Sequence, residues 1–178
     1  PNWTDNTNWL TIEPLSSWYG VTVEDNRVTK IELQGDWESS FGLINELPSE
    51  IGDLSRLEIL NLNYNELEGN IPVEIGNLTN LLELKLVRNN FAGNIPSEIG
   101  NLLNLEYLTL YGNDLTGNIP TIIGNLQNLW ILELSYNNLD GQIPLEIYNL
   151  SNLERLLLHG NNLTGEINEN IINLNKLR

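Results

Sequence analysis

Several residue types are scarce in this 178-residue chain, and each scarcity excludes a class of protein. Cysteine is absent, which excludes a disulfide framework, a thiolate zinc site and a cysteine nucleophile. Only 8 basic residues stand against 24 acidic ones. The resulting charge of −16 repels a phosphate backbone, so nucleic acid is not an expected partner. No apolar run approaches the ~20 residues of a membrane span, so direct membrane insertion is not expected.

A 24-residue repeat organises the chain. Leucine recurs at this step from Leu57 to Leu177, and columns of asparagine, glycine and isoleucine keep the same step. The asparagine column consists of Asn65, Asn89, Asn113, Asn137 and Asn161. One unit reads LxxLxLxxNxLxGxIPxEIGNLxN, as in residues 81–104. A unit of this length cannot bury its own apolar face, so stacked repeats that cover one another are predicted.

The repeat predicts an α/β solenoid, a right-handed superhelix of stacked units. The LxL segment of each unit alternates inward and outward residues and predicts a short strand. About six such strands should form one parallel sheet on the concave side, with short 3-10 or helical turns on the convex side. The strands are expected to centre near Glu32, Asn61, Lys85, Thr109, Glu133 and Leu157.

Two polar columns have expected structural tasks in this solenoid. The buried asparagine amides should bond backbone groups of their own turn and of the next unit, since a buried amide needs partners. The glycine column should occupy a turn with positive φ, where a side chain is unfavourable.

The LxGxIPxEIGNLxNL signature of residues 28–178 resembles the plant-type leucine-rich repeats of plant receptor ectodomains and polygalacturonase-inhibiting proteins. Residues 1–27 resemble the N-terminal cap of that family, so we expect a cap over 1–27 and one continuous repeat domain over 28–178. Val23 stands where one cysteine of the family's cap disulfide would fall, and Leu15 or Ser16 where the other would. This departure favours a bacterial cell-surface relative. The resemblance implies a secreted or cell-surface module that binds partners without catalysis.

Both ends of the array depart from the repeat. The cap aromatics Trp3, Trp9, Trp18 and Tyr19 are interpreted as packing over the first repeat. The first repeat is longer than the others, with the extra residues within 37–44.

The aromatic side chains of that insertion, Trp37 and Phe41, either pack on the cap or are exposed for a partner. At the other end Leu177 opens a new unit. Asn168 stands where the earlier repeats have the proline of the IPxEIG segment, so the column of prolines ends there. Because the chain also opens on Pro1 and contains no methionine, we expect a fragment of a longer protein. An uncapped last repeat also predicts self-association through its apolar edge.

The predicted concave face carries the candidate binding site. The side chains beside the inward leucines should face solvent there, and they are rich in tyrosine, tryptophan and arginine, the types enriched at binding hot spots. The candidate partner-binding residues are Tyr64, Lys85, Arg88, Tyr107, Tyr111, Trp130, Tyr136, Arg155 and His159. The expected partner is a protein, a peptide or a glycan. The alternative is that strands simply favour large side chains.

Catalysis is not expected. His159 is the only histidine, and although Ser135 and Glu133 lie on the neighbouring predicted strand, a solenoid offers them no deep pocket that excludes water. No phosphate-binding glycine loop is present, and we predict no cofactor and no metal.

Two further columns have alternative interpretations. The convex column Glu50, Glu74, Glu98 and Glu146 is either a weak cation site or a row of solvated acids at helix starts. The column Asn70, Asn94, Asn118 and Gln142, which Glu166 ends, allows an ice- or crystal-binding array. A structural adhesin stalk is the other non-catalytic alternative.

Overall fold

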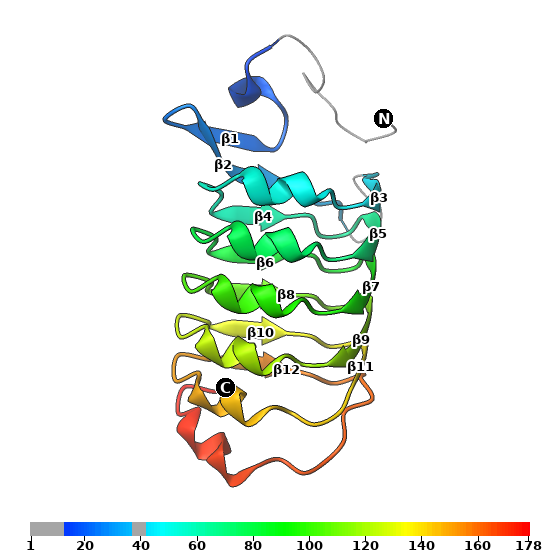
Figure 1. The fold of residues 1–178 in the computed structure, drawn as a ribbon, viewed down its shortest axis with the longest axis vertical. Coiled ribbons are helices and arrows are strands. Elements are labelled where there is room, and N and C mark those ends of the chain that lie inside the picture. The colour runs from blue at the N-terminus through cyan, green and yellow to red at the C-terminus, as the bar shows by residue number, and fades with distance from the viewer. Residues whose placement is uncertain (1–12, 37–41) are drawn as a thin grey trace.

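The computed structural model describes residues 13–36 and 42–178 and is a stack of similar coils (Figure 1). A typical coil gives one strand to each of two sheets and one 3-10 turn between them. The predicted leucine-rich solenoid is therefore confirmed. No helix in this part of the chain is long and apolar enough to cross a bilayer.

Sheet A is the sheet expected on the concave side, and it has seven strands in the order β1-β2-β4-β6-β8-β10-β12. The last six strands are parallel, one per repeat, as predicted, and β1 pairs antiparallel with β2. The strands after β2 centre on the leucine one residue before the predicted centres. Their bounds are β1 Val21–Glu24, β2 Arg27–Glu32, β4 Ile59–Asn61, β6 Glu83–Lys85, β8 Tyr107–Thr109, β10 Ile131–Glu133 and β12 Arg155–Leu157.

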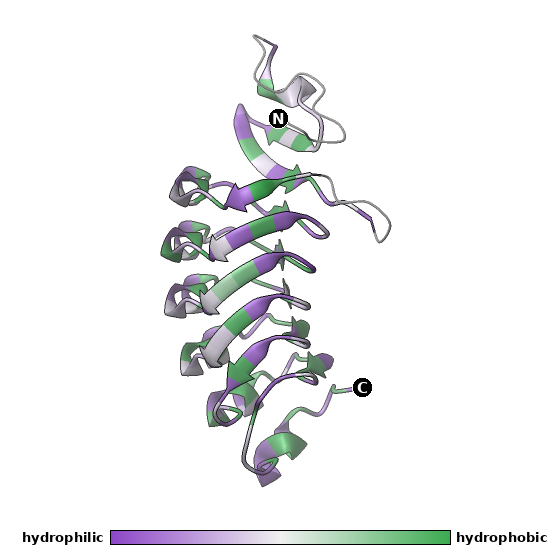
Figure 2. Ribbon diagram, turned by 90° about the vertical axis from the view of Figure 1, so that its right-hand side faces the viewer, coloured by the Kyte–Doolittle hydropathy of each residue, from purple (hydrophilic) through white to green (hydrophobic). Residues whose placement is uncertain are grey.

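Sheet B is a second parallel sheet that the sequence analysis did not predict, in the order β11-β9-β7-β5-β3. Its strands are β3 Ile44–Glu46, β5 Glu66–Asn70, β7 Asn90–Asn94, β9 Asp114–Asn118 and β11 Asn138–Asp140. Sheet B faces the viewer in Figure 2, where hydrophilic and hydrophobic residues alternate along its strands. The repeat glycines at 69, 93 and 117 lie in these strands and Gly141 directly follows β11, with φ between 70° and 75°, while Gly165 follows an isolated bridge with φ of 82°. Their positive φ is as expected, but most belong to a sheet.

The remaining side of the stack consists of 3-10 helices. From η2 to η6 each one follows the repeat proline, whose φ near −64° to −68° starts the turn. The helices are η1 Leu15–Ser17, η2 Ser49–Asp53, η3 Val73–Asn77, η4 Ser97–Asn101, η5 Thr121–Asn125, η6 Leu145–Asn149 and η7 Glu169–Asn173. The predicted short turns after the prolines are thus confirmed.

The core fills the space between the two sheets and the 3-10 helices. Leucine and isoleucine columns line it, and the leucines at 81, 84 and 86 are fully buried. Phe91 takes the place of a leucine and is also fully buried. Because each coil covers the next, burial is complete in the central repeats and decreases toward the last one, where Leu156 and Leu158 are only partly buried.

The N-terminal region is described from residue 13 onward. The predictions for Trp3, Trp9, Trp37 and Phe41 concern residues outside the described part of the chain. Of the other two cap aromatics, Trp18 is half-buried and its indole Nε1 donates to the Glu13 carbonyl, whereas Tyr19 is 46% exposed. The division into a cap over 1–27 and repeats over 28–178 stays a prediction.

The last two repeats depart from the regular stack. Tyr148 replaces the glycine that stands at 52, 76, 100 and 124, where a Cβ would collide with the next 3-10 turn. The Tyr148 ring is buried, and its hydroxyl accepts a hydrogen bond of 3.3 Å from the backbone N–H of Asn168. An open apolar hollow of about 260 Å³ lies beside it, lined by Ile143, Tyr148, Leu156, Leu158, Ile167, Ile171 and Leu177.

Candidate functional site

The candidate site lies at the ends of the strands of sheet A, where the backbone of each repeat turns toward its buried asparagine. The two residues directly before that asparagine differ in size, and from residue 87 onward the order of the small and the large residue alternates from one repeat to the next. A small first residue is followed by a large second one in Val87–Arg88 and Ser135–Tyr136, whereas a large first residue is followed by glycine in Tyr111–Gly112 and His159–Gly160. Consecutive repeats therefore place large side chains in alternate columns.

These large side chains form one continuous row, which we call the ridge: Arg88, Tyr111, Tyr136 and His159. The Arg88 guanidinium lies 5.2 Å from the Tyr111 ring centroid, and its Nη2 donates to the Tyr111 hydroxyl at 2.9 Å. Tyr111 meets Tyr136 edge to face at 5.4 Å, and Tyr136 meets His159 in the same way at 5.1 Å. The ridge thus crosses four repeats, perpendicular to the strands.

The backbone at the second position explains why glycine alternates with large residues. All five repeats adopt positive φ there, between 52° and 68°, at Tyr64, Arg88, Gly112, Tyr136 and Gly160. A large residue in this conformation costs roughly 1 kcal/mol, so glycine is the favourable choice. The glycines also make room for their neighbours, because a Cβ on Gly160 would lie 3.0 Å from the Tyr136 ring.

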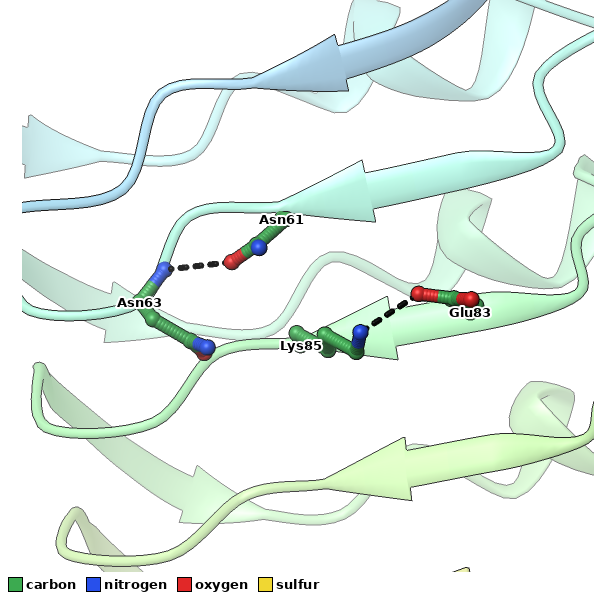
Figure 3. Close-up of polar contacts among 4 residues, drawn as sticks. All are labelled: Asn61, Asn63, Glu83 and Lys85. Atoms are coloured by element: carbon green, nitrogen blue, oxygen red, sulfur yellow. Dashed lines mark hydrogen bonds and ion pairs between the residues drawn. The ribbon is translucent and has the colours of Figure 1, made fainter.

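A second row, the strand row, consists of Lys85 in β6, Tyr107 in β8 and Trp130 directly before β10. The Lys85 ammonium lies 5.6 Å from the Tyr107 ring centroid and pairs with Glu83, as Figure 3 shows. Tyr107 meets Trp130 edge to face at 5.9 Å. Trp130 is 45% exposed, so much of its indole faces solvent.

The structure thus brings seven of the nine predicted binding residues together in two rows. Within the described residues, neither Tyr64 nor Arg155 makes a ring contact or ion pair that joins it to a row. Next to Tyr64 the polar network is local: Asn63 receives a bond from Val87 N–H and donates its own N–H to Asn61, as Figure 3 shows in part.

Two outward-facing expectations on sheet A are wrong. Ser135 is fully buried, with the His159 ring of the next repeat against its hydroxyl, and Thr109 is 8% exposed. Ser135 Oγ lies 3.2 Å from Nδ1 of His159. The serine lies beneath the ridge, and the histidine is a member of it. Because the serine hydroxyl is buried, it is not accessible to a substrate.

The asparagine column stabilises the backbone beneath the ridge. Asn113 Nδ2 donates to Leu110 O of its own repeat at 3.1 Å and to Leu86 O of the preceding repeat at 2.9 Å, while its Oδ1 accepts from Phe91 N–H. Asn65, Asn89, Asn137 and Asn161 repeat this pattern. The bonds between repeats therefore join each asparagine to the preceding unit, whereas bonds to the next unit were expected. The reason is that each amide lies next to a turn of the preceding coil.

A second asparagine ladder, which was not predicted from the sequence, lies on the outer turns. In it Asn80, Asn104, Asn128 and Asn152 each donate to a carbonyl 25 residues earlier, at 2.7 to 3.0 Å. The signal was present, since the final asparagine of the repeat keeps the 24-residue step.

The glutamates of the convex acidic column lie near the starts of the 3-10 helices. Glu50, Glu74, Glu98 and Glu146 each lie in a first turn, and Ser97 donates to Glu98 at 3.2 Å. Among the described residues, no group of three or more His, Cys, Asp or Glu side chains is placed to hold a metal ion.

Comparison with known proteins agrees with this geometry. The family model described as Leucine Rich Repeat matches residues 56–78, 80–102, 104–126, 128–150 and 152–174. No curated protein matches the chain.

Solved structures of Arabidopsis thaliana receptors are similar to the chain over most of its length. The ectodomain of the membrane receptor kinase GASSHO1/SCHENGEN3, in complex with CASPARIAN STRIP INTEGRITY FACTOR 2, is 33% identical over 97% of this chain, with a TM-score of 0.83. The chain spans only 24% of that ectodomain. In the BIR3–SERK2 complex the matched chain is 32% identical, covers 87% of this chain and is itself 81% covered, with a TM-score of 0.75.

A third similar structure is the ectodomain of the receptor kinase HAESA bound to an N-terminal extended IDA peptide hormone. It is 33% identical over 96% of this chain, with a TM-score of 0.73, and 32% of its own length is covered. The fold is that of a non-catalytic binding domain, and the expected bacterial origin stays a prediction. With the family model matched in five consecutive repeats and receptor ectodomains similar along nearly the whole chain, the protein belongs to the leucine-rich repeat family.

Proposed function

We propose that this domain binds an extended peptide segment of a protein partner across sheet A, through the ridge and the strand row. The observation that carries the proposal is the pair of aromatic and cationic rows, which cross four repeats on a sheet with no core above it. Tyrosine and tryptophan bury large areas with little loss of side-chain entropy, and arginine is enriched with them at binding hot spots. Their contacts within each row hold these side chains in place before binding.

The backbone conformation of the ridge supports this proposal. Arg88 and Tyr136 retain large side chains at positive φ, where the equivalent Gly112 and Gly160 fit without strain. Strain of this kind concentrates at functional sites. The similar ectodomains found with peptide hormones support a peptide as the partner, and a glycan is the alternative that the same aromatic surface would accommodate.

The proposed setting is a secreted or cell-surface protein, by likeness to extracellular receptor ectodomains. Self-association through the last repeat is a second proposed contact, supported by Ile167 and Ile172, which are 71% and 79% exposed. Both proposals are separate from the ridge and can fail without affecting it.

One surface supports the alternative of an ice- or crystal-binding array, namely the exposed face of sheet B. The Asn70, Asn94 and Asn118 side chains lie there in one column, each against a glycine of the next repeat. However, the exposed Glu68 and Asp140 interrupt the neutral row beside it, whereas an ice surface favours uncharged groups in a flat array. The observations therefore favour the binding module over this alternative.

Selection from a displayed random peptide library tests the proposed function. Peptides selected on wild type should lose at least about tenfold in affinity for Tyr111→Ala/Tyr136→Ala, since truncating buried aromatic anchors costs 2 kcal/mol or more. The matched control is Asn90→Ala/Thr116→Ala, which changes two exposed residues of sheet B. Calorimetry gives the affinities, and circular dichroism verifies the fold of each variant.

Equal loss in both variants, or loss in the control alone, contradicts the proposal, because the peptide would then lie elsewhere. If no peptide is selected and the wild type binds a sugar on a glycan array through the same two tyrosines, the partner class changes to glycan. If neither library binds, the recognition role is wrong and a structural stalk becomes the better account.

A further inference from the structure

One position of sheet A combines an exposed indole with carboxylates on both neighbouring strands. Trp130 lies between Glu106 and Glu154 in a single backbone ladder, since the Trp130 N–H donates to Glu106 O and the Glu154 N–H donates to Trp130 O, both at 2.8 Å. The three side chains therefore occupy the same register position in three consecutive repeats, spaced by about 4.8 Å.

The indole is held by contacts within the protein and still exposes much of its surface. Tyr107 packs edge-on against Trp130 at 5.9 Å and 67°, which orients the ring. Trp130 is 45% exposed, although a residue of this size usually lies in a core or at an interface. A tryptophan face is the best of the aromatic surfaces for attracting a cation.

The carboxylates add to this attraction. Glu106 and Glu154 are half-buried, so their charges are screened less than those of fully exposed acids. Glu154 already accepts a guanidinium from the next position of the ladder: Arg178 Nη2 lies 3.6 Å from its Oε2, and the Arg178 side chain is 81% exposed. The same chemistry occurs elsewhere in the strand row, where the Lys85 ammonium lies over Tyr107 and pairs with Glu83.

We propose that Trp130, Glu106 and Glu154 form a subsite for a cationic side chain, an arginine or lysine of the bound segment. This inference rests on the proposed function and adds the partner's chemistry: the segment across sheet A is basic at the position over β10. The charge of −16 supplies long-range attraction for such a segment, and the indole with its two carboxylates supplies the local contact.

The ridge does not provide an equivalent subsite. Its own cation, Arg88, is bonded to Tyr111, and its other end carries His159 against Tyr136. A basic segment would therefore place its cation at Trp130 and its apolar side chains along the ridge.

The test uses the intact domain and a pair of model peptides. One is an acetylated, amidated glycine–serine nonapeptide with a single central arginine, and the other carries citrulline, which has nearly the same shape without the charge. The probe is the indole N–H signal of Trp130 in ¹⁵N-labelled protein, assigned by its loss in Trp130→Phe. We expect the arginine peptide to shift this signal saturably and the citrulline peptide to bind at least about fivefold more weakly.

Three variants separate a local subsite from general attraction to an acidic protein. Glu106→Gln/Glu154→Gln should weaken the arginine peptide about fivefold, whereas the control Glu68→Gln/Glu166→Gln, which removes the same two charges from the other face, should weaken it less than twofold. Arg178→Gln should tighten binding, because it frees Glu154 from a competing guanidinium.

Three results would overturn the subsite: equal binding of both peptides, an unmoved Trp130 signal, or equal weakening by the two glutamine pairs. The failure of the subsite is distinct from that of the proposed function. If a library-selected peptide still requires Tyr111 and Tyr136 while Trp130 does not respond to arginine, the ridge remains a binding site and only the cationic subsite is wrong.

Discussion

At the residue scale, one backbone position next to the buried asparagine determines the shape of the ridge. Five repeats share its positive φ, yet Tyr64, Arg88 and Tyr136 hold side chains there that the conformation disfavours. For Arg88 and Tyr136 the contacts with Tyr111 and His159 offset part of that cost. The glycines at 112 and 160 then supply the space into which these side chains extend.

The two ridge glycines should respond differently to the same substitution. Alanine at Gly160 and at Gly112 has the same backbone cost, roughly 1 kcal/mol, because both residues have a φ of 68°. The added Cβ meets the Tyr136 ring at 3.0 Å in the first case but Arg88 Cγ at 3.3 Å in the second. We expect Gly160→Ala to lower the free energy of unfolding by more than Gly112→Ala in urea denaturation. Equal losses would show that the ring can move away freely.

The residue types of the site could be predicted from the sequence, but not their arrangement. The outward positions of Tyr107 and Tyr111 follow from the alternation of a strand, because they flank the inward Leu108 and Leu110. The alternation between neighbouring columns in successive repeats does not, because each 24-residue column was considered by itself. Burial of Ser135 follows from that arrangement, since Tyr136 and His159 cover it, and was therefore missed.

The two asparagine ladders should differ in their contribution to stability. Asn113→Ala leaves buried backbone groups of two repeats without a partner and should cost about 1–3 kcal/mol. Asn104→Ala removes one exposed bond to Thr79 O, which water can replace, and should cost less than about 1 kcal/mol. Urea titrations monitored by circular dichroism compare the two. A larger loss at Asn104 would refute the assignment of the inner ladder as the main inter-repeat support.

At the scale of the element, the last two 3-10 turns, η6 and η7, show two departures from the repeat that fit each other. Tyr148 fills the place of a glycine, and Asn168 stands where a proline would have no N–H to donate. The Asn168 N–H bonds the Tyr148 hydroxyl, and its side chain caps η7 through Asn170 N–H at 2.9 Å. The two substitutions are therefore coupled in the structure.

A double-mutant cycle tests this coupling. Tyr148→Phe removes the hydroxyl and should cost about 0.5–1.5 kcal/mol, the net value of one hydrogen bond. Asn168→Pro should destabilise the wild type more than it destabilises the Tyr148→Phe variant, because in the latter the N–H has already lost its acceptor. Thermal unfolding of the four proteins gives the interaction energy. An interaction energy of zero would mean that the 3.3 Å bond contributes nothing.

Sheet B is the element that sequence analysis did not predict. Its strands contain glycine and asparagine, which strands disfavour, as in Gly93 and Asn94 of β7. The glycine was therefore interpreted as a turn. The strands form nevertheless because the stacking of similar coils aligns backbone groups, whatever their propensity. Asn89 and Asn113 also accept hydrogen bonds from the second residues of β5 and β7, Leu67 and Phe91. Sheet A was predictable because its leucines alternate.

At the scale of the whole molecule, stability follows from stacking, so a core leucine should matter more in the centre than at the end. Leu108→Ala removes a fully buried side chain with repeats on both sides and should cost about 2–5 kcal/mol. Leu156→Ala lies in the last repeat, is only partly buried and should cost less. Guanidinium titrations measure both. Equal costs would indicate that the end of the core is as fully covered as its centre.

The charge distribution also belongs to this scale. Sheet A and the turn after β6 carry five of the chain's 8 basic residues, Arg27, Lys30, Lys85, Arg88 and Arg155, while sheet B carries acids and amides on its exposed face. The net charge was predictable from composition, and the partner it excludes is nucleic acid. Where the remaining cations lie relative to the aromatic rings required the structure.

The central claim is that a partner lies across the ridge and the strand row of sheet A. Its most direct measurement is a chemical-shift map of the ¹⁵N-labelled domain titrated with a library-selected peptide. The account predicts shifts concentrated in β6 to β12, at Tyr111, Tyr136, His159 and the Trp130 indole, with sheet B and the 3-10 helices unchanged. Shifts concentrated on sheet B or on the 3-10 helices, with the ridge unchanged, would contradict it.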